Sequence, residues 1–537
     1  MKKPPIQSLI LAMAVFLHCQ KSPGLELDFE GSRLEVVING TTYKSGDTYD
    51  WGYADTKGSL TVSGIVKNPG SSPVTFAAVP QITVGGSHAA DIVVTQPTSQ
   101  TLNAGGQIGF SFQVTPQHVL TRSANLSIAS NAESGNYVLN LSGSGYGVAL
   151  LKDIRSGATG SNPYALTNFN GYVYFAANDG VSGTELWRTD GTPNGTVLFK
   201  DFVAGASSGI SPTTQSMTVM NGVLYLSGSD ATNGNELWKS DGTVAGTQLV
   251  ANIFLGGTDS DPTFLATLGN EIVFQATQTG VMAAEVYKSN GNAGNFTLVK
   301  DINVAGSTSS TPQYFTTMGG NVYFQADDGT NGSELWKSDG TGAGTVMVTN
   351  IHTTASTGSF PHSFTAMGGY VYFCATASGE GYELRRTDGT TTSLMIDLYP
   401  GSNTGCASSA DTVGKLGSTL LFRGNQNTGL NAELYKSDGT IGNATLVKDI
   451  NPGSGASAPA GFRQLGSFAY FSATDGTNGV ELWRTDATDA GTTMVGNIES
   501  GGGSSSPANL TAFGGYLIFT ATTIALGTEL YIYVPPP

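Results

Sequence analysis

The sequence predicts an all-β chain of two β domains. Glycine accounts for 73 of 537 residues, roughly twice the usual ~7% share, while charged residues make up 12%, about half the usual ~25%. Short segments rich in β-branched and aromatic residues alternate with Gly, Asn, Asp and Pro turns, and none has helical spacing. An eight-residue segment that begins at Glu185 also returns seven times, at steps of 48 to 51 residues.

The N-terminus is expected to direct export. Lys2 and Lys3 precede an apolar run, residues 9–17, that is too short to span a bilayer, so residues 1–18 are predicted to be a signal peptide. Cys19 follows directly, where a bacterial lipoprotein carries its acylated cysteine, and residues 19–32 then form a lipidated tether. The alternative is a signal-peptide cysteine with no further role, in a protein that is secreted.

Residues 33–146 have strand-like texture without the long period. Turn signals recur every eight to twelve residues, among them Asn68-Pro69-Gly70, and predict an immunoglobulin-like (Ig-like) β-sandwich. The stretch resembles the choice-of-anchor D type of Ig-like domain, related to the abnormal-spindle and hydin-type modules. This resemblance implies a spacer or protein-contact module.

Residues 147–534 contain the repeats. Each repeat holds four strand-like segments, and a period near fifty residues is typical of propeller blades. The chain ends before the eighth copy can be followed by its own fourth strand, whereas residues 148–154 have the fourth-strand pattern and precede the first repeat. We therefore expect an eight-bladed β-propeller that is closed by an N-terminal strand in the last blade.

The repeated octad, as in Glu334-Leu335-Trp336-Lys337-Ser338-Asp339-Gly340-Thr341, resembles the bacterial ELWxxDGT repeat family. That resemblance covers some 385 residues and implies a secreted or surface repeat protein of unassigned activity. Arg385, Asn290 and Ala487 depart from the octad, and the sixth repeat lacks the proline that is present at Pro163.

A role repeated in every blade favours a structural interpretation of the octad. We expect its Glu to accept backbone hydrogen bonds, its Trp to pack between blades and its Asp to cap a hairpin, although a ring of ligands is the alternative. The repeat-structural residues are Glu185, Trp187, Asp190, Glu236, Trp238, Asp241, Glu334, Trp336, Asp339, Glu481, Trp483 and Asp486.

Candidate sites are few. The hairpin residues Asp179, Asp328 and Asp475 are weak candidates for calcium ligands, although each loop offers only one or two carboxylates. The fifth repeat is unusual because it holds His352 and His362, where a metal site lacks an evident third ligand. No catalytic motif is found, so we expect no catalytic residue and no required cofactor.

Cys374 and Cys406 remain if Cys19 is lipidated. Adjacent blades could bring the two cysteines together, but the simpler expectation is a buried free thiol at Cys374.

The net charge of −16 disfavours nucleic acid and anionic membrane surfaces as partners. We expect a monomeric lipoprotein on the cell envelope or outer-membrane surface, attached to the membrane through its lipid alone. It would act as a non-catalytic binding or adhesion scaffold for an extracellular protein or glycan. The alternatives are a polysaccharide-active propeller enzyme, hydrolase or lyase, with a cluster of carboxylates or His in one or two blades, and a purely structural envelope protein.

Overall fold

The computed structural model describes residues 31–537, except 78, 134, 211–215, 281–282, 305–307, 355, 408–410 and 427–430. Their regular structure is β-strand apart from one 3-10 turn, η1 (Ala89–Asp91), which confirms the all-β class. Within this described part, no helix has the length and apolar character needed to cross a membrane. The expected signal peptide, Cys19 and the tether up to residue 30 lie outside the described residues.

The first of two compact units comprises residues 31–51, 60–114 and 123–142. It contains a five-stranded sheet of order β2-β1-β4-β9-β7, a short β5-β8 pair, and strands β6, β10 and β3, which are joined to β11. Alternate residues along the strands are buried, including Val36, Phe112 and Leu139. The strands are β1 (Glu35–Ile38), β2 (Thr41–Tyr43), β3 (Thr48–Asp55), β4 (Leu60–Lys67), β5 (Val74–Thr75), β6 (Ile82–Gly85), β7 (Ile92–Thr95), β8 (Thr101–Leu102), β9 (Gln107–Val114), β10 (Leu120–Ile128) and β11 (Tyr137–Lys152).

The second unit comprises residues 52–59, 115–122 and 143–537 and is built from repeated four-stranded antiparallel sheets, which we number in chain order. The first four sheets are β12 (Tyr164–Phe169), β13 (Tyr172–Asn178), β14 (Thr184–Thr189), β15 (Val197–Lys200); β16 (Met217–Met220), β17 (Val223–Asp230), β18 (Gly234–Ser240), β19 (Gln248–Ala251); β20 (Thr263–Leu268), β21 (Glu271–Thr277), β22 (Ala284–Ser289), β23 (Thr297–Lys300); and β24 (Gln313–Met318), β25 (Asn321–Asp327), β26 (Ser333–Ser338), β27 (Val346–Thr349). The others are β28 (His362–Met367), β29 (Tyr370–Thr376), β30 (Tyr382–Thr387), β31 (Thr392–Ile396); β32 (Val413–Leu416), β33 (Thr419–Gly424), β34 (Glu433–Ser437), β35 (Thr445–Lys448); β36 (Ala460–Leu465), β37 (Phe468–Thr474), β38 (Val480–Thr485), β39 (Thr493–Gly496); and β40 (Ala508–Phe513), β41 (Tyr516–Thr523), β42 (Gly527–Val534) with the last part of β11.

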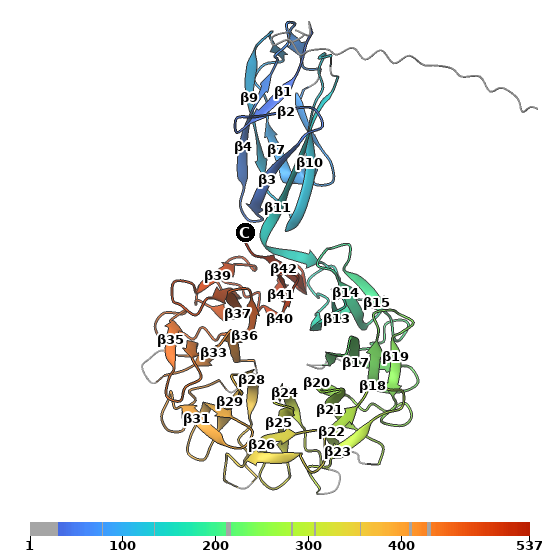
Figure 1. Cartoon of the computed structure of the whole chain (residues 1–537), viewed down its shortest axis with the longest axis vertical. Coiled ribbons are helices and arrows are strands. Elements are labelled where there is room, and N and C mark those ends of the chain that lie inside the picture. The colour runs from blue at the N-terminus through green and yellow to red at the C-terminus, as the bar shows by residue number, and fades with distance from the viewer. Residues whose placement is uncertain are drawn as a thin grey trace, which may run out of the picture. The chain divides into compact units, whose positions relative to one another are not determined.

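The sheets of this unit form a propeller-like ring (Figure 1). The first strand of each sheet contacts the first strand of the next, from β12 through β40, and β40 in turn contacts β12. Side chains reinforce these contacts, since Asn168 Nδ2 donates to the Ala512 carbonyl at 2.8 Å and Thr317 Oγ1 to the Thr267 carbonyl at 2.8 Å. The first strands therefore surround the centre of the ring.

The eighth sheet is completed by a strand from the start of the unit. Residues Gly147 to Lys152 of β11 pair antiparallel with Val534 to Leu530 of β42, so segments almost 400 residues apart in the sequence share one ladder. This fourth strand leaves β42 paired on both sides.

Glu529 secures the same junction. Its buried carboxylate accepts hydrogen bonds from the backbone N–H groups of Ile154 at 3.0 Å and Arg155 at 3.1 Å, and from both the N–H and the Oγ of Ser161. One side chain of the last sheet thereby holds the segment that leads into the first sheet.

We predict that Glu529→Ala lowers the free energy of unfolding by about 3 kcal/mol or more, because several buried donors lose their acceptor. Urea denaturation measures the loss, and hydrogen exchange should show faster exchange in β11 and β42 than in the third and fourth sheets. Glu271→Ala is the control, because the solvent-accessible, partly buried pair of Glu271 with Lys288 is expected to stabilise by about 1 kcal/mol or less. Unchanged stability in Glu529→Ala would refute this role.

Candidate functional site

The octad glutamates are almost completely buried, and each one holds the crossover that leads to the next sheet. Glu334 accepts from the N–H groups of Ile351 and His352 and from Ser359 Oγ, and Glu481 binds its own crossover in the same way. Glu236 binds the Ile253 N–H at 2.7 Å. The carboxylate oxygens thus accept hydrogen bonds from the protein's own crossovers.

The serine that donates to this carboxylate is absent in two repeats. Gly209 and Gly405 stand at that position, so Glu185 and Glu383 each accept from backbone N–H groups without a serine hydroxyl. Burial raises the pKa of Glu185, Glu236 and Glu383 to about 7 against the opposing effect of these donors.

The octad aspartates cap their own turns. In the first, second, fourth and seventh repeats, Oδ1 accepts both the N–H and the hydroxyl of the threonine two residues later, which lowers the pKa of Asp241, Asp339 and Asp486. Asp190 makes the same two bonds to Thr192.

The octad tryptophans lie between adjacent sheets. Trp238 packs with Tyr174 and Leu186 of the first sheet, and Trp336 packs with Val273 of the third. Trp187 packs with Ile532 of the eighth sheet, and Trp483 is buried with residues of the sixth.

The basic residue after the tryptophan position also connects sheets. Its side chain donates to the turn carbonyl of the following octad, as Lys239 does to Gly291 at 2.9 Å and Arg386 to Gly439 at 2.6 Å. Lys337 and Lys436 make the same connection. Lysine and arginine are therefore both accommodated at this position.

The hairpin aspartates that were weak calcium candidates use their carboxylates within the loop. Asp328 accepts the N–H groups of Thr330 and Asn331 on Oδ1 and the Asn331 amide on Oδ2, and Asp475 does the same with Asn478. Asp179 binds Val181 and Ser182. Throughout the described residues, no group of three or more His, Cys, Asp or Glu side chains is arranged to hold a metal.

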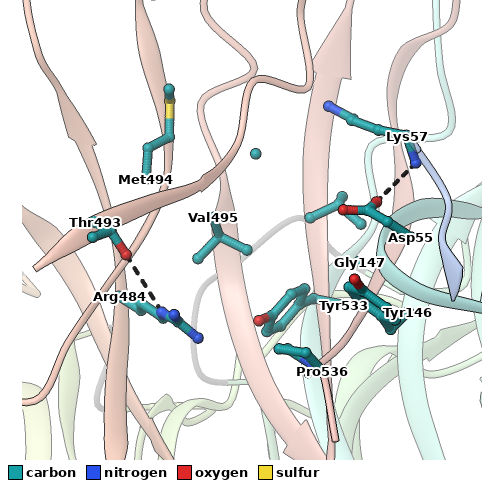
Figure 2. Close-up of a pocket in the computed structure, with 12 residues that line it drawn as sticks. Asp55, Lys57, Tyr146, Gly147, Arg484, Thr493, Met494, Val495, Tyr533 and Pro536 are labelled. Carbon is teal, nitrogen blue, oxygen red and sulfur yellow. Dashed lines mark hydrogen bonds between the residues drawn. The ribbon is translucent and has the colours of Figure 1, made fainter. Parts of the chain in front are cut away.

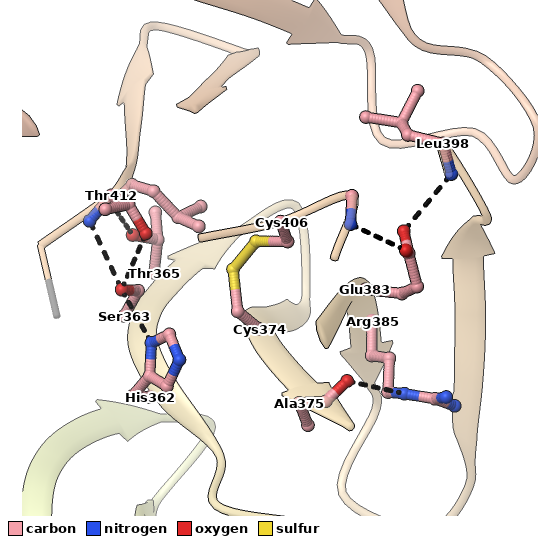
Figure 3. The surroundings of a disulfide bond; sticks show 12 residues. His362, Ser363, Thr365, Cys374, Ala375, Glu383, Arg385, Leu398, Cys406 and Thr412 are labelled. Atoms are coloured by element: carbon pink, nitrogen blue, oxygen red, sulfur yellow. Dashed lines mark hydrogen bonds between the residues drawn. A yellow bond between two sulfur atoms is a disulfide. The ribbon is translucent and has the colours of Figure 1, made fainter. Parts of the chain in front are cut away.

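His362 begins β28, and its environment is drawn in Figure 3. Its ring packs against Tyr382 with centroids 5.4 Å apart, and Nδ1 lies 3.1 Å from Ser363 Oγ. Burial lowers the pKa of His362 to about 4, so the imidazole is neutral at physiological pH. Ser363 has a φ of 59° and lies in a β-bulge. The same bulge recurs in other first strands, with positive φ at Ala165 and Tyr314.

Cys374 and Cys406 form a disulfide with a Cα–Cα separation of 6.0 Å (Figure 3). The expectation of a free thiol at Cys374 was therefore wrong. Cys374 lies in β29 of the fifth sheet, and Cys406 lies in the crossover that leads to the sixth. The bond joins two neighbouring sheets, and their contact is visible only in the fold.

The first strands of three consecutive sheets carry the charged and imidazole side chains of the inner ring. These are His362 on β28, Lys415 on β32 and Arg463 on β36, and the other first strands, as described, carry none. Asp411 precedes β32 at the repeat position that His362 occupies in β28. We call His362, Asp411, Lys415 and Arg463 the inner-strand cluster.

Backbone and hydroxyl contacts hold this cluster. Ser363 Oγ lies 3.1 Å from Thr412 Oγ1 and accepts the Thr412 N–H, which fixes the residue after Asp411 against β28. Lys415 Nζ donates to the Ala366 carbonyl at 2.8 Å, and Arg463 Nε to the Leu510 carbonyl at 2.9 Å.

Asp411 combines solvent access with partial desolvation. Its side chain is exposed, but the surrounding protein removes part of its hydration and raises its pKa, while the positive charge of Arg463 opposes the shift. A carboxyl group with a raised pKa beside a cation can carry a proton in catalysis.

Sequence reasoning missed Asp411, Lys415 and Arg463. It noted that the sixth repeat lacks its proline, and that was the available signal, because Asp411 directly follows the altered segment. The register of the first strands was needed to place Asp411 level with His362.

A separate small cavity of about 190 Å³ lies in the second unit (Figure 2). It is lined in part by Arg484, Thr493, Tyr533 and Pro536. Arg484 is the basic octad residue of the seventh repeat, and the eighth octad ends in prolines instead of an Asp-Gly turn. Arg484 Nε instead lies 3.4 Å from Thr493 Oγ1, and its guanidinium packs over Phe468.

Comparison with known proteins gives structural neighbours alone. No family model matches the sequence. A search of curated proteins likewise finds no match. A puromycin hydrolase matches over 70% of this chain and 60% of its own, with 14% identity and a TM-score of 0.39. A puromycin-hydrolyzing peptidase of Mycobacterium tuberculosis matches over 70% and 61%, with 10% identity and a TM-score of 0.42.

The β-propeller domain of the trilobed protease from Pyrococcus furiosus matches over 58% of this chain and 89% of its own, with 9% identity and a TM-score of 0.35. The chain thus spans about 60% of the puromycin hydrolase and all but a tenth of the protease propeller domain. These neighbours agree with the propeller-like arrangement of repeated sheets.

The comparisons correct the expected function. The expectation of a non-catalytic binding or adhesion scaffold is contradicted by neighbours that are hydrolases. The low identities and TM-scores confine the likeness to the fold, so no substrate follows from it.

We predict that the ring is more stable at pH 5.5 than at pH 8.5. A carboxyl whose pKa is raised to about 7 in the folded state contributes stability that is complete below its unfolded value of about 4.3 and is lost as the pH rises through 7. Scanning calorimetry across this range measures the melting temperature. Glu185→Gln should weaken the pH dependence, and a melting temperature that rises toward pH 8.5 would contradict the expectation.

We predict that the paired change Cys374→Ala and Cys406→Ala lowers the free energy of unfolding by about 3 kcal/mol, because the disulfide closes a loop with a sequence separation of 32. Urea denaturation measures the loss. A reducing agent should destabilise the unsubstituted chain by a similar amount and leave the double variant unchanged, because only the former has the bond to lose. Equal stability of the double variant and the oxidised unsubstituted chain would rule out this contribution.

Proposed function

We propose that the chain is an exported polysaccharide-active enzyme, a hydrolase or lyase, whose reacting groups lie in the inner-strand cluster. One observation carries the proposal: in the first strands as described, charged and imidazole side chains occur in three neighbouring sheets. A residue that builds every sheet recurs in every repeat, whereas Asp411, Lys415 and Arg463 correspond to uncharged residues elsewhere. At the repeat position of Asp411, other repeats carry Tyr164, Thr263, Gln313, Ala460 and Ala508.

The composition of the cluster favours a lyase. Glycosidases commonly use two carboxyl groups across the scissile bond, and the described cluster contains one carboxylate with two cations. In an elimination, Asp411 would remove the proton from the carbon next to a uronate carboxylate. The electron pair then forms the carbon–carbon double bond, the glycosidic C–O bond breaks, and the leaving oxygen takes up the proton that Asp411 removed.

The cations fit this chemistry. Arg463, whose positive charge acts on Asp411, would bind the uronate carboxylate and stabilise the negative charge that develops after proton removal. Lys415, farther along β32, would attract the acidic polysaccharide. Partial desolvation makes Asp411 a stronger base than an ordinary aspartate. His362 is buried behind Ser363 and would position Thr412, and with it Asp411, rather than react.

We also propose the finer features of the architecture. The second unit is an eight-bladed propeller of the ELWxxDGT repeat family, supported by eight octads. The first unit is an Ig-like sandwich of the choice-of-anchor D type that acts as a spacer. The signal peptide, acylation of Cys19 and placement on the cell envelope rest on the residues at the N-terminus, and a monomer with no nucleic-acid partner is in keeping with the charge of −16.

The full chain should release unsaturated oligosaccharides from an acidic polysaccharide, detected by ultraviolet absorbance and mass spectrometry. Asp411→Asn should reduce turnover at least about 100-fold, because the proton acceptor is lost. The control is Gln313→Ala, the same repeat position in the fourth sheet, which should keep full activity. Hydrolysed products without unsaturation would leave an enzyme but not a lyase, and full activity in Asp411→Asn would overturn the proposed site.

A further inference from the structure

A cavity of about 470 Å³ lies where the fifth and sixth sheets meet, at the turn ends of their first strands. It is lined by Met367 at the end of β28, by Tyr370 and Tyr372 of β29, and by the turn residues Gly417 and Ser418. Arg386, Lys415 and the Asp438-Gly439-Thr440 turn complete the wall. Its volume is in the usual range for small-ligand sites.

Two cations share this cavity. The Arg386 guanidinium lies over the Tyr370 ring at 4.2 Å from the centroid and donates from one nitrogen to the Gly439 carbonyl. A guanidinium has five N–H donors, so this bond leaves others for a ligand. Lys415 Nζ donates to Ala366, and an ammonium group likewise has further donors.

The combination is confined to this junction. Arginine also stacks on an aromatic ring in the first and seventh repeats, through Arg188 and Arg484. At those two junctions, however, the repeat position of Lys415 in the following sheet is occupied by Val219 and Ala512. At the junctions on either side of the cavity it is occupied by Ala366 and Gln464. The junction of the fifth and sixth sheets therefore carries an arginine and a lysine where its neighbours offer one cation.

Lys415 links this cavity to the inner-strand cluster. It follows Asp411 by four residues along the same chain segment, and four residues of strand span roughly 13 Å. A polysaccharide that reaches Asp411 can therefore reach the cavity with a sugar unit farther along its chain.

We propose that this cavity is a subsite for an acidic sugar unit, a uronate, of the polysaccharide substrate, and this inference rests on the proposed function. The uronate carboxylate binds Arg386 and Lys415, and the sugar ring packs near Tyr370. Asp438, whose carboxylate accepts the Thr440 N–H, stays on the rim and disfavours substrates with a second negative charge on that side.

Binding can be measured separately from turnover. The full chain carrying Asp411→Asn is titrated by calorimetry with an oligogalacturonate and with a neutral oligogalactan of equal length. The acidic oligosaccharide should bind at least tenfold more tightly.

Arg386→Lys added to this background should weaken oligogalacturonate binding about tenfold at an unchanged melting temperature, because lysine makes the same inter-sheet bond in other repeats. Lys415→Gln should act similarly. Lys337→Gln, which changes an inter-sheet lysine remote from the cavity, is the control and should leave affinity unchanged.

The outcomes separate the two proposals. If both cavity variants retain wild-type affinity, or if the neutral oligosaccharide binds equally well, the subsite is overturned. If they weaken binding while the unsubstituted chain cleaves no acidic polysaccharide, the subsite stands and the proposed catalytic function fails. If Asp411→Asn loses turnover and the cavity variants keep affinity, the catalytic proposal stands alone.

Discussion

The buried carboxylate of each octad glutamate is the interaction on which the ring depends. In most sheets it accepts donors 17 and 24 or 25 residues farther along the chain, as Glu236 does from Ile253 and Ser260, and in the fifth sheet donors 15 and 22 residues farther along. Burial of a carboxylate without a neighbouring cation is unfavourable, and the charge-assisted bonds from the crossover offset that penalty. The repeat length follows from this geometry, because each crossover must return to the glutamate of the preceding sheet before it starts the next.

Once the crossovers are held, neighbouring sheets meet in a fixed register, and two further octad residues exploit it. The tryptophan fills the space between sheets, and the basic residue reaches the turn carbonyl of the next octad. The two junctions of the eighth sheet, the second of which closes the ring, use the glutamate contact but lack the contact of the basic residue. Glu529 finds its donors at the start of the unit, but Arg484 has no following Asp-Gly turn, and its side chain borders a cavity instead. Arg484 therefore differs from basic residues such as Lys239 and Arg386, which bond to a following octad turn.

The sequence was sufficient to predict what each repeat does for itself. The strand segments, the capped Asp-Gly turns and the fourth strand from residues 148–154 follow from local patterns that are copied along the chain, and repetition makes them conspicuous. Contacts between repeats were harder to predict. Cys374 and Cys406 lie in different segments of neighbouring repeats, and their pairing depends on how far a crossover returns over the preceding sheet.

The inner-strand cluster was missed because its residues are not repeated along the chain. Asp411, Lys415 and Arg463 occur once each at their repeat positions, and a search for repetition passes over them. Their side chains become neighbours only when the first strands surround one centre, and single-sequence reasoning had no register with which to align the sixth repeat after its missing proline.

The sixth repeat shows how such a departure is tolerated. Its usual proline is absent from the sequence, and Gly405 stands where most repeats place the serine, so Gly405 donates to Glu383 through its backbone N–H without a hydroxyl. The crossover that leads to Asp411 is therefore held to its glutamate by fewer hydrogen bonds than in most repeats. The disulfide to Cys374 and the contacts of Ser363 with Thr412 restrain that crossover from its two ends. A carboxylate acts reproducibly only when its segment is held in place, and these two restraints hold the segment that carries Asp411 beside Arg463.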